Sequence, residues 1–311
     1  MTRRGPGRTA WPLVALFMSP FVAGLVIFGL YPIGATVYYS FTDFRTGSYR
    51  PVHLVGLANY TTLLTGSDVF WRAVGNTLWM VAVLVPVRTA FALFAAWVLG
   101  RLRRGAAIYR TIFFVPSMVP VVASALSFIV MLNPAGPVNS LLGHLGVTGP
   151  GWFSDPAWTK PSLVVMALWA CGDAMVIFSA AMLDVPRDLL EAAQLDGAGA
   201  SRRFWHVTLP ALRPVLLFSG LTGVIYTFQY FTEAFVASGS ANGLNGGNLS
   251  LGYPQNSLLF YSTEIYRQGF VYFKTGYASA AAVLLFVVIF AATLMFLRAF
   301  SALTPDPGAQ R

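Results

Sequence analysis

The stretch from Asp184 to Pro214 reads DVPRDLLEAAQLDGAGASRRFWHVTLPALRP, and it lies between two long apolar segments. It carries four acidic residues and four arginines. Because ionised side chains are costly in hydrocarbon, this stretch must lie in water while its flanks lie in lipid. We call it the charged loop. The charged loop predicts a membrane protein with a polar segment exposed on one side of the bilayer.

Capping and breaking residues predict a first short helix in the charged loop. Asp188 followed three residues later by Glu191 matches the capping-box pattern, so we expect a helix from Asp188 through Leu195. Gly197 and Gly199 are expected to end this helix, because glycine supplies the backbone freedom that a sharp reversal needs.

A second short helix is expected after the glycines. Ser201 can cap a helix over Arg202–Val207, which must end before Pro210 because proline lacks an amide hydrogen and clashes with the preceding turn. Two short helices joined by a glycine turn form a compact projection, which we call the knob. Its small size suits a groove on a partner protein. The alternative is an amphipathic segment that lies on the lipid headgroups without a partner.

Three motifs in the charged loop resemble a known family. In chain order they are Glu191, Ala192 and Ala193; Asp196, Gly197 and Ala198; and Leu209 and Pro210. They resemble the EAA loop of ABC importer permeases, in the branch that takes up carbohydrates. In that family the loop docks into a cleft of the ATPase subunit. The resemblance therefore implies that Glu191 anchors the knob in that cleft and that Gly197 holds its turn.

The composition excludes several classes of protein. With 56% hydrophobic and only 10% charged residues over 311 positions, the chain is a polytopic membrane protein. The single cysteine, Cys171, excludes an internal disulfide and a cysteine metal cluster. The net charge of +9 comes from arginines spread over short loops, which suits membrane orientation and argues against nucleic acid as a partner.

Apolar runs predict six transmembrane helices in an all-α fold, and the resemblance implies that they form a permease bundle of the type I importer kind. The first run is too long for a signal peptide and is long enough to span the bilayer. We expect helices at about 11–33, 74–99, 111–132, 162–183, 215–236 and 277–300. These helices and the loop 184–214 make up one expected permease domain over 11–300, with tails at 1–10 and 301–311.

The basic residues predict the orientation. If the N-terminus is cytoplasmic, the cytoplasmic segments carry more than twice as many basic residues as the outer ones, as the positive-inside rule requires. The cytoplasmic set is Arg3, Arg4, Arg8, Arg101, Arg103, Arg104, Arg110, Arg187, Arg202, Arg203, Arg213, Arg298 and Arg311; the outer set is Arg45, Arg50, Arg72, Lys160, Arg267 and Lys274. Both termini and the charged loop are therefore expected in the cytoplasm of a bacterial cell, with the chain in its cytoplasmic membrane.

The outer loops are expected to be short caps without a separate domain. Asp43–Phe70 and Asn133–Pro161 contain mostly connecting residues, although the first includes Gly56-Leu57-Ala58-Asn59-Tyr60. The tract Gly239–Asn248, within the third loop, is rich in Gly, Asn and Ser and is interpreted as a flexible lip of unknown role.

Residues outside the charged loop extend the resemblance to carbohydrate permeases from about Trp11 to Phe300. The similar segments are Tyr31-Pro32, Asn76-Thr77, Phe114-Val115-Pro116, Trp169 with Ile177-Phe178, and Gly276-Tyr277-Ala278-Ser279-Ala280. One departure is the stretch Gly239–Pro254, which is longer than the matching loop of many relatives.

Motifs for nucleotide binding and catalysis are missing from the sequence. No G-x-x-x-x-G-K-[ST] stretch is present, so this chain is expected to bind no cofactor; if it is an active transporter, the ATPase with its ATP and Mg²⁺ is a separate protein. His53, His144 and His206 are far apart in sequence, so we expect no metal site. We likewise name no catalytic residue, since no G-x-S-x-G elbow occurs.

Three ionisable residues fall inside the expected spans. Asp173, Glu233 and Arg88 each need a cavity or a partner charge, because an isolated charge in hydrocarbon is costly. One interpretation is structural, with Arg88 paired to one of the two acids. The other is that Asp173 and Glu233 line a polar path for the substrate. The role of Arg88 stays open between them.

Sugar chemistry favours further residues for that path. Gln229 is one helical turn before Glu233, and amides and carboxylates bond readily to hydroxyl groups. Tyr226 and Tyr230 are on the same expected helix, where aromatic faces could stack on a pyranose or simply pack.

The resemblance implies a permease subunit that pairs with a second, homologous permease, docks two ATPase subunits and accepts a carbohydrate from an extracytoplasmic binding protein by alternating access. Two other classes remain: a secondary carrier that uses Asp173 or Glu233 as a proton site, and a membrane enzyme with those acids as an acid/base pair. The sequence does not distinguish a disaccharide from a monosaccharide or a glycerol phosphate, nor does it say whether this subunit contacts the substrate.

Overall fold

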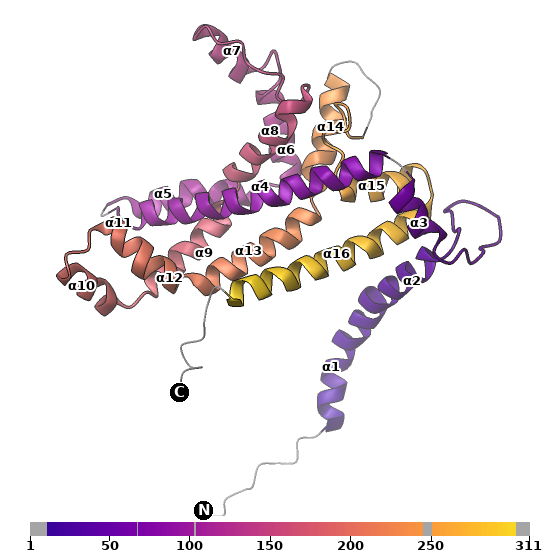
Figure 1. Cartoon of the computed structure of the whole chain (residues 1–311), viewed down its shortest axis with the longest axis horizontal. Helices are drawn as coiled ribbons and strands as arrows, with labels where there is room; N and C mark the ends of the chain where they lie inside the picture. Colours follow the sequence, from indigo (N-terminus) through magenta and orange to yellow (C-terminus); the bar gives the residue numbers. More distant parts are fainter. Residues whose placement is uncertain (1–10, 67, 103, 245–250, 303–311) are drawn as a thin grey trace, which may run out of the picture. The chain divides into compact units, whose positions relative to one another are not determined.

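The computed structural model describes residues 11–66, 68–102, 104–244 and 251–302. Within them the regular secondary structure is helical, apart from one isolated β-bridge between Thr42 and Leu54. Backbone contacts divide the chain into two compact units, one of residues 1–66 and 268–284 and one of residues 67–267 and 285–311. The elements are α1 (Trp11–Leu25), η1 (Val26–Leu30), α2 (Tyr31–Ser40), α3 (Ala58–Thr65), α4 (Asp68–Leu99), α5 (Ala106–Phe114), η2 (Val115–Met118), α6 (Val121–Met131), α7 (Pro137–His144), α8 (Pro156–Trp169), α9 (Gly172–Leu183), α10 (Arg187–Leu195), α11 (Ala200–Arg203), η3 (Phe204–Thr208), α12 (Leu209–Ala211), α13 (Arg213–Phe228), α14 (Thr232–Leu244), α15 (Tyr261–Tyr266), η4 (Arg267–Val271) and α16 (Thr275–Ala302) (Figure 1).

Within the described residues, four helical runs are long and apolar enough to cross a membrane: Leu13–Ser40, Asp68–Leu99, Arg213–Gly239 and Thr275–Phe300. Two bent pairs raise the number of candidate spans to six if each pair is one span. The all-α membrane class is therefore confirmed. The bent pairs are α5–η2 with α6, at an angle of 98°, and α8 with α9, at 48°.

Helix breaks divide three of the expected spans. Pro116 and Pro120 lie at the sharp bend between α5 and α6, since proline cannot continue the backbone hydrogen bonding of a helix. The α8–α9 break falls at Ala170 and Cys171. The expected span over 215–236 lies within the candidate span Arg213–Gly239, but its helix is interrupted at residues 229–231, which separate α13 from α14. Gln229 and Glu233 are therefore not one turn apart on a single helix.

The first unit is held together by side chains in the first turn of α3. Asn59 donates to the backbone carbonyls of Ser40 and Thr42 at 2.9 and 2.8 Å, and the Tyr60 hydroxyl bonds to the Ser40 hydroxyl at 2.8 Å. These bonds satisfy carbonyl groups that the end of α2 leaves without helical partners. Gly276 then packs against Thr42 so closely that a Cβ would meet its carbonyl oxygen. This segment thus does more than connect two spans.

The second unit is built around α4, which packs against α9 and α13 (Figure 1). Two apolar clusters follow α4 along its length. One includes Met80 and Leu84, and the other runs from Ala92 to Leu99 with Phe178 of α9. Arg88 lies between the two clusters in the sequence of α4, so the charged side chain falls where the apolar packing is interrupted.

Gly172 permits the close crossing of α9 and α5. A Cβ at this position would meet the carbonyl oxygen of Phe113 and would lie 2.7 Å from the Cα of Phe114. Both neighbours are backbone atoms, so neither can rotate away.

Replacing Gly172 with alanine is expected to lower the free energy of unfolding by about 1–3 kcal/mol, the usual cost of overpacking a core. Thermal unfolding of the detergent-purified chain measures this change. Gly75→Ala on α4 is the matched control, because a Cβ there meets no atom within 4 Å. An unchanged melting temperature for Gly172→Ala would contradict the close crossing.

The segment before α15 is tied to α4 by two polar residues. The Asn76 amide donates to the carbonyls of Asn256 and Leu259 at 2.8 and 2.9 Å, and the Thr77 hydroxyl accepts from the Tyr261 backbone at 2.9 Å. Lys160 of α8 donates to the remaining Asn76 oxygen at 3.1 Å. One buried asparagine therefore joins three segments of the second unit.

Two expectations about loops and tails have different outcomes. The interpretation of Gly239–Asn248 as a flexible lip was wrong for residues 239–244, which continue α14 as a helix. The rest of that tract, the tail 1–10 and most of the tail 301–311 lie outside the described residues.

Candidate functional site

A cavity of about 390 Å³ lies in the second unit where the three helix breaks meet α4. Its wall contains Ser117 from the α5–α6 bend, Asp173 beside the α8–α9 break and residues 229–231 between α13 and α14. Irregular backbone at membrane depth is tolerated where it lines a cavity, because the freed polar groups can then be solvated. All five residues that the sequence proposed for a substrate path line this cavity: Asp173, Tyr226, Gln229, Tyr230 and Glu233.

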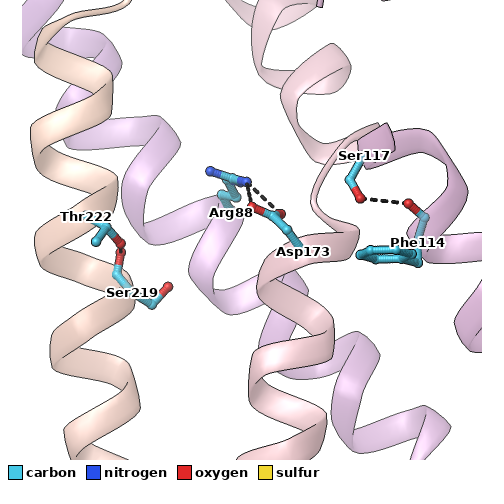
Figure 2. Close-up of polar contacts among 6 residues, drawn as sticks. All are labelled: Arg88, Phe114, Ser117, Asp173, Ser219 and Thr222. Carbon is cyan, nitrogen blue, oxygen red and sulfur yellow. Dashed lines mark hydrogen bonds and ion pairs between the residues drawn. The ribbon is translucent and has the colours of Figure 1, made fainter. Parts of the chain in front are cut away.

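Arg88 and Asp173 form an ion pair at this cavity. The guanidinium Nη2 donates to both carboxylate oxygens, at 2.8 and 3.0 Å, and Figure 2 shows the two side chains pointing toward one another from neighbouring helices. The side chains are 32% and 55% exposed, so the pair lies open to the cavity. Of the two acids that the sequence left open as partners for Arg88, the structure selects Asp173.

The two acids occupy equivalent positions in their helices. Asp173 lies in the first turn of α9 and Glu233 in the first turn of α14, each directly after a break. A helix N-terminus carries a partial positive charge, which favours a carboxylate there. Unlike Asp173, Glu233 makes no ion pair with any residue in the described part of the chain. The cavity therefore contains one paired and one unpaired carboxylate.

The aromatic candidates differ in exposure. Tyr226 is 71% exposed, whereas Tyr230 is 8% exposed and packs edge-on against Phe260. The buried Tyr230 hydroxyl has no hydrogen-bond partner among the described residues, and the same holds for the Nε of Arg88. Buried polar groups usually find a partner, so these two atoms leave hydrogen-bonding capacity unused beside the cavity.

Sequence reasoning missed four hydroxyl side chains of the cavity wall, Ser117, Ser124, Thr227 and Thr232. Ser117 bonds to the carbonyl of Phe114 at 2.7 Å, which places it within the bend (Figure 2). Proline on both sides of Ser117 was the signal that could have indicated a broken helix there. The complete wall offers carboxylates, an amide, hydroxyls and aromatic faces, which suit a ligand with many hydroxyl groups.

The charged loop begins with α10, which ends in a Schellman motif. Gly197 has a φ of +77°, its backbone N–H donates to Gln194, and the N–H of Ala198 donates back to Ala193 at 2.9 Å. These two bonds satisfy carbonyls that the helix end would otherwise leave free, and the positive φ is the reason glycine is needed. The glycine turn of the knob is present as the sequence indicated.

Both capping interpretations were wrong. α10 begins at Arg187 after Pro186, and neither Asp188 nor Ser201 caps a helix, because the N-cap positions are Pro186 and Gly199 and show no side-chain cap bond. Proline and glycine already start these helices through backbone geometry.

The second helix of the charged loop is longer than the sequence predicted. Its expected end before Pro210 was wrong, because helical structure continues from α11 through the π-turn η3 into α12. The N–H of Leu209 donates to Phe204, five residues back, and Pro210 then lies in the first turn of α12, where a missing N–H costs little.

The motif residues lie mostly on the surface of the knob, which Figure 1 shows beyond the ends of α4 and α13. Glu191, Ala192, Asp196 and Gly197 are exposed, and Ala193, Ala198, Leu209 and Pro210 are partly buried. Large apolar side chains are exposed beside them: Leu189 at 53%, Leu195 at 90% and Trp205 at 61%. Apolar groups gathered at a polar surface often mark an interaction site.

Sequence comparison relates the chain to transport proteins. Residues 88–304 match the profile of the binding-protein-dependent transport system inner membrane components. The chain is 33% identical to the probable ABC transporter permease protein YesP of Bacillus subtilis, over 92% of this chain and 89% of the relative. It is 32% identical to the lactose transport system permease protein LacF of Rhizobium radiobacter (92% and 93% coverage) and 34% identical to the diacetylchitobiose uptake system permease protein NgcF of Streptomyces coelicolor (90% and 78%).

Solved structures share the fold. A chain of a bacterial ABC transporter involved in the import of the acidic polysaccharide alginate matches with a TM-score of 0.79 at 22% identity, over 94% of this chain and 96% of that one. The same kind of match, with a TM-score of 0.80 at 21% identity, is found in a complex of the alginate transporter with its pentasaccharide-bound periplasmic protein, over 95% of this chain and 96% of that one. These likenesses support the permease fold.

Proposed function

The chain belongs to the family of binding-protein-dependent transport system inner membrane components, and from this premise we propose that it is the permease subunit through which an ABC importer moves a sugar. The names of its relatives support a sugar as the cargo, since they include permeases for lactose, arabino-oligosaccharides and diacetylchitobiose. The chain is a transport subunit and has no phosphate-binding loop in its sequence, so ATP and Mg²⁺ would be bound by a separate ATPase.

The observation that carries this proposal is the cavity at the three helix breaks. Asp173, Gln229 and Glu233, which the sequence proposed on chemical grounds, line one space together with Tyr226 and Tyr230. Transporters typically bind their substrate where helices are interrupted, because the ends of the half-helices present free polar groups. A sugar offers hydroxyls to the polar groups and a C–H face to the tyrosines.

The charged loop supplies the proposed link to ATP. In this proposal Glu191 anchors the knob in a cleft of an ATPase subunit and the exposed leucines contact the cleft walls. A second, homologous permease and two ATPase subunits complete the transporter, and a binding protein outside the cell delivers the sugar. Closure of the ATPases then moves the knobs, and the cavity becomes accessible from the opposite side of the membrane.

The proposed orientation follows from the arginines. The chain is embedded in the membrane, and the higher number of arginines and lysines on the side that includes the charged loop and both ends supports a cytoplasmic location of these segments in a bacterial cell. Labelling of single cysteines introduced at Asp188 and Thr61, after replacement of Cys171, distinguishes the two faces. Labelling of Asp188 from outside intact cells would reverse the assignment.

Copurification tests the proposed assembly. The tagged chain, extracted in mild detergent, should bring with it a second permease and an ATPase that carries a phosphate-binding loop. The ATPase of this copurified assembly should hydrolyse ATP faster when loaded binding protein is added. If the chain is instead recovered alone and moves sugar in vesicles with a proton gradient and without ATP, the importer proposal fails and a secondary carrier takes its place.

Replacing Tyr230 with phenylalanine is expected to raise the KM for sugar uptake about tenfold, because loss of a hydroxyl that bonds the substrate costs roughly 1–2 kcal/mol. The same change should leave the melting temperature unchanged or slightly higher, since it removes a buried hydroxyl without a protein partner. Tyr261→Phe, at another buried tyrosine that does not line the cavity, is the control for uptake. An unchanged KM for Tyr230→Phe would remove this hydroxyl from the binding site.

A further inference from the structure

A second cavity, of about 400 Å³, lies where the charged loop meets the ends of α4, α5 and α9. Arg101, Arg110 and Arg203 line it, and no carboxylate occurs among the described residues of its wall. The three arginines come from separate segments: one directly after α4, one in α5 and one at the end of α11. We call this space the basic cavity.

The arginines of the basic cavity have few protein partners. Arg110 makes no hydrogen bond or ion pair with any described residue, and its Nε is buried. Arg203 donates one bond to the side chain of Gln194 at 2.9 Å. Arg101 places its guanidinium 3.8 Å from the centre of the Trp97 ring. Most of the donor groups on these side chains are therefore available to a ligand.

Charge balance points to an anion as that ligand. Three guanidinium groups around one space repel each other, and repulsion of this kind is relieved when a negative group binds between them. The acidic residues of the charged loop do not supply it, because Asp184, Asp188, Glu191 and Asp196 form no ion pair in the described chain. Guanidinium groups match the oxygens of a phosphate particularly well, since two parallel N–H groups can bind it at once.

The rest of the lining of the basic cavity is mainly apolar. Trp97, Met182, Leu183, Leu190 and Phe204 contribute to it. Moreover, Arg101 follows the long apolar helix α4 by two residues, which places the basic cavity at the depth of the lipid headgroups. A ligand that suits both the arginines and the apolar residues of this lining carries a phosphate together with a hydrocarbon part, as a phospholipid does.

We propose that the basic cavity binds the phosphate group of an anionic phospholipid and thereby ties the charged loop to the membrane surface. Basic pockets between transmembrane helices at the cytoplasmic surface are suited to such headgroups. Because the charged loop contributes Leu190, Arg203 and Phe204 to the wall, an occupied cavity holds the knob against the ends of α4 and α9. The basic cavity is separate from the 390 Å³ cavity proposed to bind the sugar, and lipid binding there does not depend on which sugar is transported.

Lipid retention tests the proposal. The full-length chain, with any subunits that copurify, is placed in nanodiscs of phosphatidylcholine and phosphatidylglycerol, and native mass spectrometry then counts the lipids retained after extraction. Wild-type protein should retain phosphatidylglycerol in preference to phosphatidylcholine. Arg110→Gln should lower the ratio of retained phosphatidylglycerol to retained phosphatidylcholine about tenfold. Arg110→Lys should restore part of it, because lysine keeps the charge without the fork of donors.

Two controls separate the sources of the effect. Arg104→Gln removes a neighbouring positive charge that does not line the basic cavity, so it should keep the wild-type preference. An equal preference in wild-type and Arg110→Gln protein, at equal size-exclusion profiles, would overturn the site. Binding of inorganic phosphate as tightly as phosphatidylglycerol, with loss in Arg110→Gln, would overturn the lipid assignment in favour of a free anion.

Discussion

Replacing Gly197 with valine is expected to abolish ATP-driven sugar uptake while the chain still inserts into the membrane. The φ of +77° at this position is accessible to glycine and strained for a β-branched residue. Nothing lies within 4 Å of the position that a Cβ would take, so the effect comes from the backbone alone. The Schellman motif would open, and the knob would present Glu191 at a different angle to its ATPase cleft. Uptake into vesicles and the yield of copurified ATPase measure the two consequences.

Two control substitutions separate the effect of the positive φ at Gly197 from the effect of adding a side chain to the charged loop. Gly199→Val should leave uptake near the wild-type level, because Gly199 has an extended backbone, with φ of −63° and ψ of 167°, and equally open surroundings. Gly197→Asn should retain most of the uptake, since asparagine tolerates positive φ. Normal uptake by Gly197→Val would remove the turn from the coupling mechanism.

Replacing Asp173 with asparagine is expected to lower sugar uptake at least about tenfold, because it removes the negative charge of the ion pair and replaces one of the two acceptors for Arg88 with an NH₂ donor. The asparagine keeps the size of the side chain, so packing at the start of α9 should be preserved. Uptake kinetics at saturating and limiting sugar concentrations separate a change in KM from a change in maximal rate. Asp155→Asn is the control: it makes the same change outside the cavity and retains a residue that caps α8 well.

The double variant Arg88→Gln with Asp173→Asn distinguishes the two interpretations of the ion pair. If the pair serves only to neutralise charge, removing both partners should restore uptake, because neither charge is then left alone. We expect uptake to remain low, since the cavity would have lost a guanidinium and a carboxylate that hydrogen-bond to hydroxyl groups. Recovery of uptake by the double variant would assign the pair a structural role.

The sequence indicated the class of the protein and the glycine turn well because both have strong local signals. Long apolar runs identify membrane helices through composition alone. The positive φ at Gly197 requires glycine, so the residue type revealed the conformation. Capping was predicted less well, because proline at Pro186 and glycine at Gly199 start the helices without a side-chain bond.

The helix breaks and the ion pair were harder to predict. The break at 229–231 contains neither proline nor glycine, so nothing in the residue types marks it. The π-turn η3 shifts the hydrogen bonds by one residue and allows the helix to continue through Pro210, which no propensity rule describes. Arg88 and Asp173 are 85 residues apart, and only the packing of α4 against α9 decides which acid meets the arginine.

The bonds from Asn76 to the segment before α15 have a mechanical consequence. Asn76 holds that segment by two carbonyls, and Arg88 lies twelve positions further along the same helix, or roughly 18 Å along its axis. α4 is a single helix over both positions, with Pro86 inside it, so we expect a displacement of residues 256–259 to reach the cavity lined by Arg88 through helix backbone and not through a loop. α4 therefore links the hydrogen bonds of Asn76 near one end to the Arg88–Asp173 ion pair near its middle.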